Sequence, residues 1–157
     1  MTEIKEVTSA VEKSIICNDI LRALPNWFGV EDSIVEYTAG VKNKPFYGVF
    51  DSGTAVGFVS VLVHNPYTAE IYVMGISEAC HGQGIGKKLV VICEKYCHTH
   101  GIEFLTVKTL DASREDPYYE STRKFYHAVG FRPLEVFTTV WGEANPCLFL
   151  AKYIGRG

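Results

Sequence analysis

Alternating glycines in the middle of the chain form the strongest chemical signal in the sequence. Gly82, Gly84 and Gly86 lie between an extended apolar run, residues 70–76, and a helix-like run that begins near residue 85. Glycines at such a turn remove side chains at the point where a helix presents its unpaired N–H groups. These groups and the positive end of the helix dipole bind phosphates readily. The spacing therefore predicts a phosphate site at this turn.

Two lysines directly after the turn strengthen this interpretation. Lys87 and Lys88 fall in the first turn of the expected helix, where cations oppose the helix dipole and are locally unfavourable. A bound anion would reverse the sign of that interaction. The alternative is a tight turn whose lysines are simply solvated.

The common nucleotide-binding motifs do not fit these glycines. The dinucleotide fingerprint requires G-x-G-x-x-G, whereas the position of its last glycine is occupied by Lys87. The P-loop requires four residues between its glycines, but only three separate Gly82 from Gly86. The phosphate ligand must therefore belong to another class.

The elements that position this turn follow from the spacing of apolar residues. Pro25 and Gly101 mark the expected ends of two helices, and turn residues separate the extended runs. This pattern indicates an α/β or α+β domain with a mixed sheet. Strands are expected over 4–7, 45–50, 55–63, 70–76, 103–110, 134–141 and 147–153, and helices over 9–24, 31–39, 85–101 and 119–129.

Composition limits the class of protein. The chain has 157 residues with 15 basic and 18 acidic side chains, a net charge of −3, and 47% hydrophobic residues. These values are typical of one folded domain and argue against a disordered chain or a nucleic-acid-binding protein. No apolar run is long enough to cross a membrane, and the first residues lack the apolar block of a signal peptide. We therefore expect a cytoplasmic protein that binds neither nucleic acid nor membranes.

The cysteines agree with a reducing compartment. Five are scattered along the chain, which is not the pattern of a disulfide framework. Cys93, Cys97, His98 and His100 form a cluster that a metal could use, but no second spaced pair completes a zinc site. The alternative, buried apolar cysteines, is favoured, and no metal is expected.

Two segments resemble the hallmarks of the GCN5-related N-acetyltransferases, the GNAT family. HGQGIG at residues 81–86 resembles the family's Q/R-x-x-G-x-G/A pyrophosphate loop, with His81 where Arg or Gln is usual. FYHAVGF at residues 125–131 is similar to the second hallmark, a Tyr followed four and five residues later by Gly-Phe. Tyr119 stands where many members have Asn. The resemblance covers about residues 45–153 and is to small, bacterial-type members.

This resemblance implies a fold and a cofactor. Residues 1–157 would form a single N-acetyltransferase domain, with variable substrate-side helices over 1–44 and the core sheet and CoA site over 45–153. The sheet would be mixed and mostly antiparallel, flanked by helices, with an acetyl-CoA cleft between its two central strands. The residues implied to bind acetyl-CoA are Met74, Gly75, Ile76, His81, Gly82, Gln83, Gly84, Ile85, Gly86 and Lys87.

The resemblance also implies a reaction, the transfer of the acetyl group of acetyl-CoA to a primary amine by direct attack. Tyr126 matches the family's general acid, which protonates the departing thiolate; packing is the other reading of this tyrosine. An alkylammonium must lose a proton before it can attack. Glu70, in a segment that resembles the family's base-bearing strand, is the candidate base. Ordered water and the side chains of His64, Glu78 and His81 are the alternatives.

The acceptor amine is left open, as a small molecule or a protein amino group. Trp27 and Phe28 fall in the loop where relatives build the acceptor wall, although core packing explains them equally well. Carboxylates that could attract a cationic amine are Glu31, Asp32, Glu36 and Glu143. A homodimer is common in the family and fits the apolar last strands. The competing function is a non-catalytic regulatory module that binds CoA or acetyl-CoA.

Overall fold

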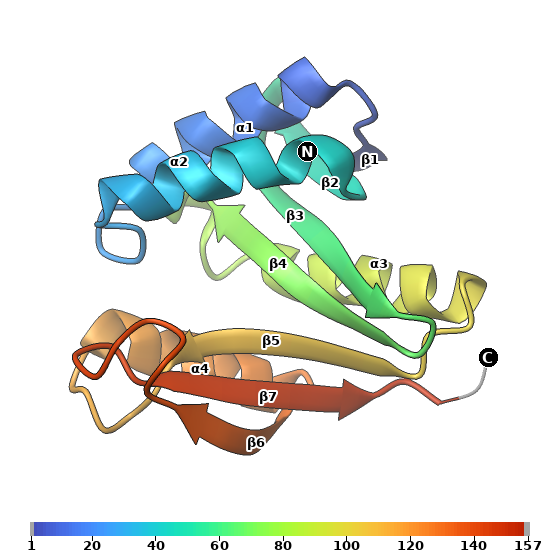
Figure 1. Ribbon diagram of the computed structural model, residues 1–157. Coiled ribbons are helices and arrows are strands. Elements are labelled where there is room, and N and C mark those ends of the chain that lie inside the picture. The colour runs from blue at the N-terminus through green and yellow to red at the C-terminus, as the bar shows by residue number, and fades with distance from the viewer. Residues whose placement is uncertain (1, 156–157) are drawn as a thin grey trace. The chain divides into compact units, whose positions relative to one another are not determined.

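A seven-stranded sheet runs through the computed structural model, which describes residues 2–155 (Figure 1). Its strand order is β1-β2-β3-β4-β5-β7-β6. The pairs β1–β2, β2–β3, β5–β7 and β6–β7 are antiparallel, whereas β4–β5 is parallel. The strands are β1 (Thr2–Glu6), β2 (Phe46–Asp51), β3 (Thr54–Asn65), β4 (Thr68–Ile76), β5 (Phe104–Leu110), β6 (Arg132–Phe137) and β7 (Cys147–Tyr153).

The helices follow the expected order along the chain. The mixed, mostly antiparallel sheet and the α/β alternation agree with the predicted fold class. The helices are α1 (Ala10–Arg22), α2 (Glu31–Gly40), α3 (Ile85–Thr99) and α4 (Pro117–Ala128), with short 3₁₀ turns η1 (Val41–Asn43) and η2 (Glu78–Cys80).

Polar caps define where two helices begin. The Ser9 side chain accepts a hydrogen bond from the Glu12 amide at the start of α1. Asp116 accepts from the amides of Tyr118 and Tyr119, and Pro117 occupies the first turn of α4. Proline suits that position because its missing N–H would have no helical partner there. The helix α4 therefore begins at residue 117, two residues before the predicted start.

The strand β6 is shorter than the sequence pattern predicts. An extended run was expected over 134–141, but β6 spans Arg132–Phe137. Its last pair is Phe137 with Cys147, the first residue of β7. Because the partner strand begins only there, residues 138–141 have no ladder to join, although Val140 and Trp141 are apolar.

The chain divides into two compact units. The first contains residues up to 62 and 72–92, and the second contains 63–71 and the residues from 93 onward. In the first unit, α1 and α2 bury their apolar faces with Phe46 and Phe58, whose stacked rings lie 5.1 Å apart. In the second unit, buried Leu105, Val107 and Leu150 from β5 and β7 form part of the core.

Candidate active site

The glycine turn of the first unit has the backbone that its sequence predicts. Gly82 and Gly84 both adopt φ +78°, in the left-handed region that favours glycine. A Cβ atom at either position would meet nothing within 4 Å. The Lys88 amide donates to the Gly84 carbonyl, so the helical ladder of α3 begins there. The amides just before Lys88 have no helical acceptor, and the glycines beside them carry no side chain, which suits a pyrophosphate.

The side chain of His81 forms a hydrogen bond with the backbone just before this turn. Its Nε2 lies 2.7 Å from the Ile76 carbonyl oxygen, and because a carbonyl only accepts, Nε2 carries the donated proton. The edge of the ring also packs on Trp27, with ring centroids 5.4 Å apart. The contacts of His81 with Ile76 and Trp27 therefore help to fix the segment between β4 and α3.

The end of β4 lacks a strand partner on one edge. Pairing with β5 covers Thr68–Ile71 and Phe104–Val107, and among the described residues it does not extend to 72–76. The backbone groups of Met74, Gly75 and Ile76 are therefore free of ladder bonds on that edge. They could form hydrogen bonds with an extended amide-containing chain.

Gly75 is packed closely on its other side. A Cβ atom there would lie 3.0 Å from the Ile20 side chain, 3.2 Å from Phe58 and 3.3 Å from Leu21. Side chains of α1 and β3 thus approach the β4 backbone closely at this glycine. A larger residue would press on the core of the first unit.

The candidate acceptor residues are only half-buried. Trp27 and Phe28 pack against the core cluster of the first unit, and the Phe28 ring lies 6.2 Å from that of Tyr37. Glu31 is engaged by Arg22, whose guanidinium donates to both carboxylate oxygens and lowers the pKa of the carboxyl group. The remaining acidic candidates, Asp32, Glu36 and Glu143, are exposed.

Tyr126 lies in the second unit, in the last turn of α4, where the second hallmark forms a helix cap. The Phe131 amide donates to the Tyr126 carbonyl and the Gly130 amide to that of His127, the two bonds of a Schellman motif. Gly130 has φ +105°. The rings of Tyr126 and Phe131 lie 5.5 Å apart and supply the apolar contact that accompanies this motif. The spacing of Tyr126, Gly130 and Phe131 in the hallmark is therefore the spacing that a C-terminal helix cap requires.

The same cap at α3 shows what this motif requires. There the Ile102 amide donates to the Cys97 carbonyl and the Gly101 amide to that of His98. Cys97 takes the position that Tyr126 takes in α4, so the cap needs a glycine and apolar neighbours but no phenol. The side chain of Tyr126 is only 6% exposed, and the two hydrogen bonds of the cap do not involve its hydroxyl group.

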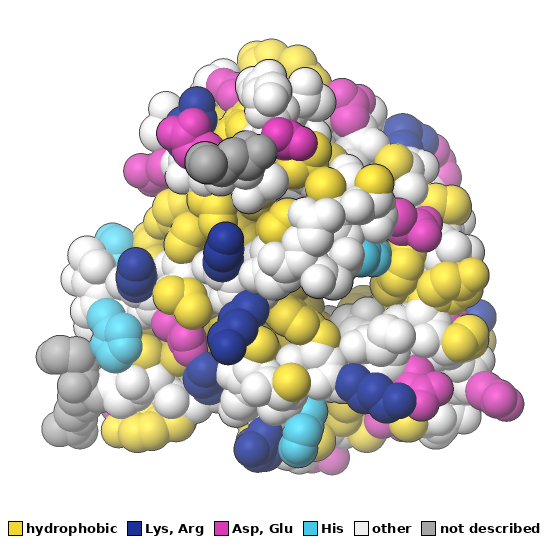
Figure 2. All heavy atoms as spheres, turned by 180° about the vertical axis from the view of Figure 1, so that it is seen from behind, with side chains coloured by type: hydrophobic (Ala, Val, Ile, Leu, Met, Phe, Trp, Pro, Cys, Tyr) yellow, Lys and Arg dark blue, Asp and Glu magenta, His cyan; other side chains and the backbone are white. Residues whose placement is uncertain are grey.

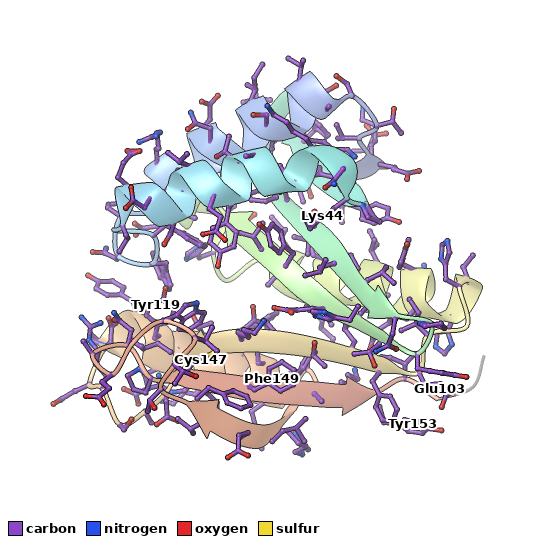
Figure 3. The ribbon with its side chains drawn as sticks, in the orientation of Figure 1. Lys44, Glu103, Tyr119, Cys147, Phe149 and Tyr153 are labelled. Atoms are coloured by element: carbon purple, nitrogen blue, oxygen red, sulfur yellow. The ribbon has the colours of Figure 1, made fainter. Side chains whose placement is uncertain are left out.

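Tyr119, where many members have Asn, is half-buried on α4 (Figure 3). Burial, together with the nearby Asp116 carboxylate, raises the pKa of its phenol to about 12. The group therefore stays protonated at neutral pH and can act only as a neutral donor or acceptor.

Glu70 is buried rather than solvated at the strand edge. Its side chain is 6% exposed and its Oε1 lies 2.7 Å from Nε2 of His64. Nζ of Lys108 lies 3.0 Å from Oε1 and 3.1 Å from Oε2. These three side chains belong to the second unit. Lys108 gave no signal in the sequence, because 38 residues separate it from Glu70 and only strand pairing brings them together.

The cysteine cluster has no feature of a metal site in the described part of the chain. Cys93 and Cys97 are buried on α3, and burial raises the pKa of the Cys97 thiol to about 11. No group of three or more His, Cys, Asp or Glu side chains is placed to hold a metal ion among residues 2–155.

The helices and the charged side chains of the surface bear on membrane and nucleic-acid binding. No helix of residues 2–155 is long and apolar enough to span a membrane. Lys and Arg side chains on the face seen in Figure 2 are interrupted by hydrophobic and uncharged ones.

Comparison with known proteins agrees with the fold of the sheet. A model of the acetyltransferase (GNAT) family matches residues 15–131. No curated protein matches the sequence. A GNAT-family acetyltransferase from Desulfovibrio desulfuricans has a similar structure, with a TM-score of 0.83 at 11% identity, covering 99% of this chain and 100% of that one.

Two further structures have the same fold. One, from Elizabethkingia anophelis, is a GNAT-family acetyltransferase with acetyl-CoA bound; its TM-score is 0.73 at 16% identity, over 97% of both chains. The other is the aminoglycoside 6'-N-acetyltransferase from Enterococcus faecium, with a TM-score of 0.75 at 21% identity, covering 99% of this chain and 98% of that one.

The chain belongs to the GNAT acetyltransferase family. It is an acetyl-CoA-dependent acyltransferase that transfers the acetyl group to an amine.

Proposed function

We propose that acetyl-CoA binds with its pyrophosphate at the glycine turn and its pantetheine arm along the end of β4. The observation that carries this assignment is the pair of left-handed glycines, Gly82 and Gly84, which open α3 with no side chain nearby. Gln83, Ile85, Gly86 and Lys87 would contribute backbone amides and charge there. Met74, Gly75 and Ile76 would bind the arm through backbone groups that lack a β5 partner, apart from the Ile76 carbonyl, which accepts from His81.

Tyr126 and Glu70 supply the proton transfers in this proposal. Acetyl-CoA brings an activated acetyl group, and the chain must remove a proton from the amine and return one to the departing thiolate. The Tyr126 hydroxyl, which the helix cap does not need, is the general acid. The Glu70 carboxylate is the group that drives removal of the proton. No metal takes part.

The acceptor in this proposal is a primary amine of a small molecule or a peptide. One similar structure is named as an aminoglycoside acetyltransferase and another as an acetyltransferase of a ribosomal-protein alanine, so both classes of acceptor occur on this fold. A panel with members of each class is the appropriate screen.

We also propose that the protein is cytoplasmic and forms a homodimer. All five cysteines are free, as is usual for a protein of a reducing compartment. The edge strand β6 exposes Leu134, Val136 and Phe137, and an apolar edge strand of this kind is usually covered in solution.

Calorimetric titration with acetyl-CoA tests the assignment of the turn. Gly84→Ala should weaken binding about tenfold, because an L-residue in the left-handed region costs roughly 1–2 kcal/mol that the turn can recover only by changing shape. Gly53→Ala is the matched control, since Gly53 has φ +83° and equally empty surroundings in the β2–β3 turn. Its affinity for acetyl-CoA should equal that of the wild type. Equal affinity of the Gly84→Ala variant would refute the assignment.

A further inference from the structure

Three strands each contribute, from their residues in the second unit, one member of a hydrogen-bonded group of titratable side chains. His64 lies near the end of β3, Glu70 in β4 and Lys108 in β5. Glu70 is central and is bonded to both of the others. We refer to these residues as the His64–Glu70–Lys108 group.

Lys108 has a defined place in the sheet. The β4–β5 pairing ends at Ile71 with Val107, and Lys108 is the next residue of β5. Its cross-strand partner on β7 is Phe149, whose ring centroid lies 5.9 Å from Nζ (Figure 3 labels Phe149). The ammonium group is therefore held between an aromatic face and the Glu70 carboxylate.

The Glu70 carboxylate is largely occupied. Oε1 is bonded to both His64 and Lys108, and Oε2 is bonded to Lys108. Lysine has donors only, so both oxygens serve as acceptors. With a side chain 6% exposed, Glu70 offers little room for an amine to contact it directly.

His64 has the opposite properties. Its side chain is 39% exposed. Its Nε2 faces an accepting oxygen and therefore carries a proton, which leaves Nδ1 of the neutral ring as an acceptor. Among residues 2–155, nothing forms a hydrogen bond with Nδ1.

We propose that Glu70 acts through His64: Nδ1 of His64 takes the proton from the acceptor amine, while Glu70 and Lys108 are positioning residues that orient the imidazole and stabilise its charged form. This inference rests on the proposed function and identifies the general base in it. The amine N–H bond breaks and the proton passes to Nδ1, directly or through one water. The nitrogen electron pair forms the new C–N bond, the C–S bond breaks, and the thiolate receives the proton of Tyr126. The Tyr126 phenolate then takes the second proton that the acylated nitrogen loses. The imidazolium then releases its proton to solvent.

The other titratable group near these residues does not compete for the proton. Cys147 lies on β7 and is influenced by both Lys108 and Glu70. Burial, reinforced by Glu70 and opposed by Lys108, raises the pKa of its thiol to about 11. Cys147 is therefore a neutral thiol at the pH of an assay.

Long-range ¹H–¹⁵N NMR spectra of the ligand-free protein test the orientation of the ring. The neutral ring of His64 should be the Nε2–H tautomer; its signal is identified by its loss in His64→Gln. Glu70→Ala should weaken that preference. The Nδ1–H tautomer in the wild type would overturn the proposal.

Kinetics test the chemistry, with the amine from the panel that the wild type acetylates fastest. His64→Ala should lower kcat/KM about 10²-fold, remove the acidic limb of its pH profile, and regain activity when imidazole is added. His98→Ala is the control, because His98 is an exposed histidine at the end of α3. It should behave as the wild type. A His64→Ala variant that keeps the wild-type rate and pH profile, or that imidazole does not rescue, would overturn the proposal.

The failure of this inference is distinguishable from that of the proposed function. Acetyl-CoA affinity, measured by calorimetry, should be unchanged in His64→Ala because His64 is not among the residues assigned to acetyl-CoA. If the wild type neither binds acetyl-CoA nor acetylates any amine, the proposed function fails. If the wild type does both and His64→Ala matches it, only the role of His64 fails.

Discussion

Tyr126 has a packing role that can be separated from its proposed chemical role. Its carbonyl and ring belong to the Schellman cap of α4, through Phe131. Its hydroxyl group is not part of that cap. The two contributions can therefore be separated by a substitution that removes one oxygen and keeps the ring.

Tyr126→Phe should lower kcat about 10²-fold, because a general acid contributes rate enhancement of that order or more. The melting temperature and the affinity for acetyl-CoA should stay near those of the wild type, since the ring still packs on Phe131. Tyr153→Phe is the control, because Tyr153 is a tyrosine exposed on β7. A wild-type kcat in Tyr126→Phe would leave the phenol with a packing role alone.

At the level of single residues, the sequence predicts the glycine turn better than the proton-transfer groups. Gly82 and Gly84 lie close together in the chain, and their role depends on local backbone conformation. The partners of Glu70 are six and 38 residues away. Their proximity depends on strand register, which periodicity does not reveal when turns are irregular.

The two capped helices, α3 and α4, differ in what surrounds their terminal glycines. Gly101 has φ +69° with nothing within 4 Å of a Cβ atom, whereas a Cβ on Gly130 would lie 3.0 Å from Cε of Lys152. Lys152 also donates to the Val129 carbonyl and to Glu94. The end of α4 is therefore stabilised by a cation at its carbonyl end, a favourable arrangement for the helix dipole.

Gly130→Ala should destabilise the protein more than Gly101→Ala. Both substitutions carry the left-handed cost of roughly 1–2 kcal/mol, but only the first displaces Lys152 from its acceptors. Chemical denaturation of both variants measures the difference in the free energy of unfolding. Equal losses would show that Lys152 moves aside without cost.

Most elements could be predicted from the sequence because their signals are local. The i, i+4 spacing of apolar residues located α3, and Ser9 and Pro25 bounded α1. The end of β6 could not be predicted this way, because it depends on where β7 begins. The length of a strand depends on the strand it pairs with, so the sequence of one strand alone does not determine where it ends.

At the scale of the whole molecule, β6 is the last strand of the sheet and all of its residues are exposed. Apolar side chains and unpaired backbone groups on an edge strand favour pairing with another chain. This arrangement supports a second copy of the protein as the partner in the proposed homodimer.

Sedimentation at micromolar concentration should show a dimer for the wild type and a monomer for the Leu134→Glu, Val136→Glu variant. Two buried carboxylates would oppose association at the β6 edge. Val11→Glu, at an exposed valine of α1, is the control and should remain dimeric. A monomeric wild type would refute the homodimer.

Gly82 and Gly84 impose a constraint of handedness rather than of size. Each position has room for a side chain, yet each backbone has the sign of φ that L-residues avoid. The turn depends on the one amino acid that is achiral, and its amides remain unshielded as a result. The constraint at these positions is therefore the sign of φ, so that alanine, the smallest chiral residue, is disfavoured even where space is plentiful.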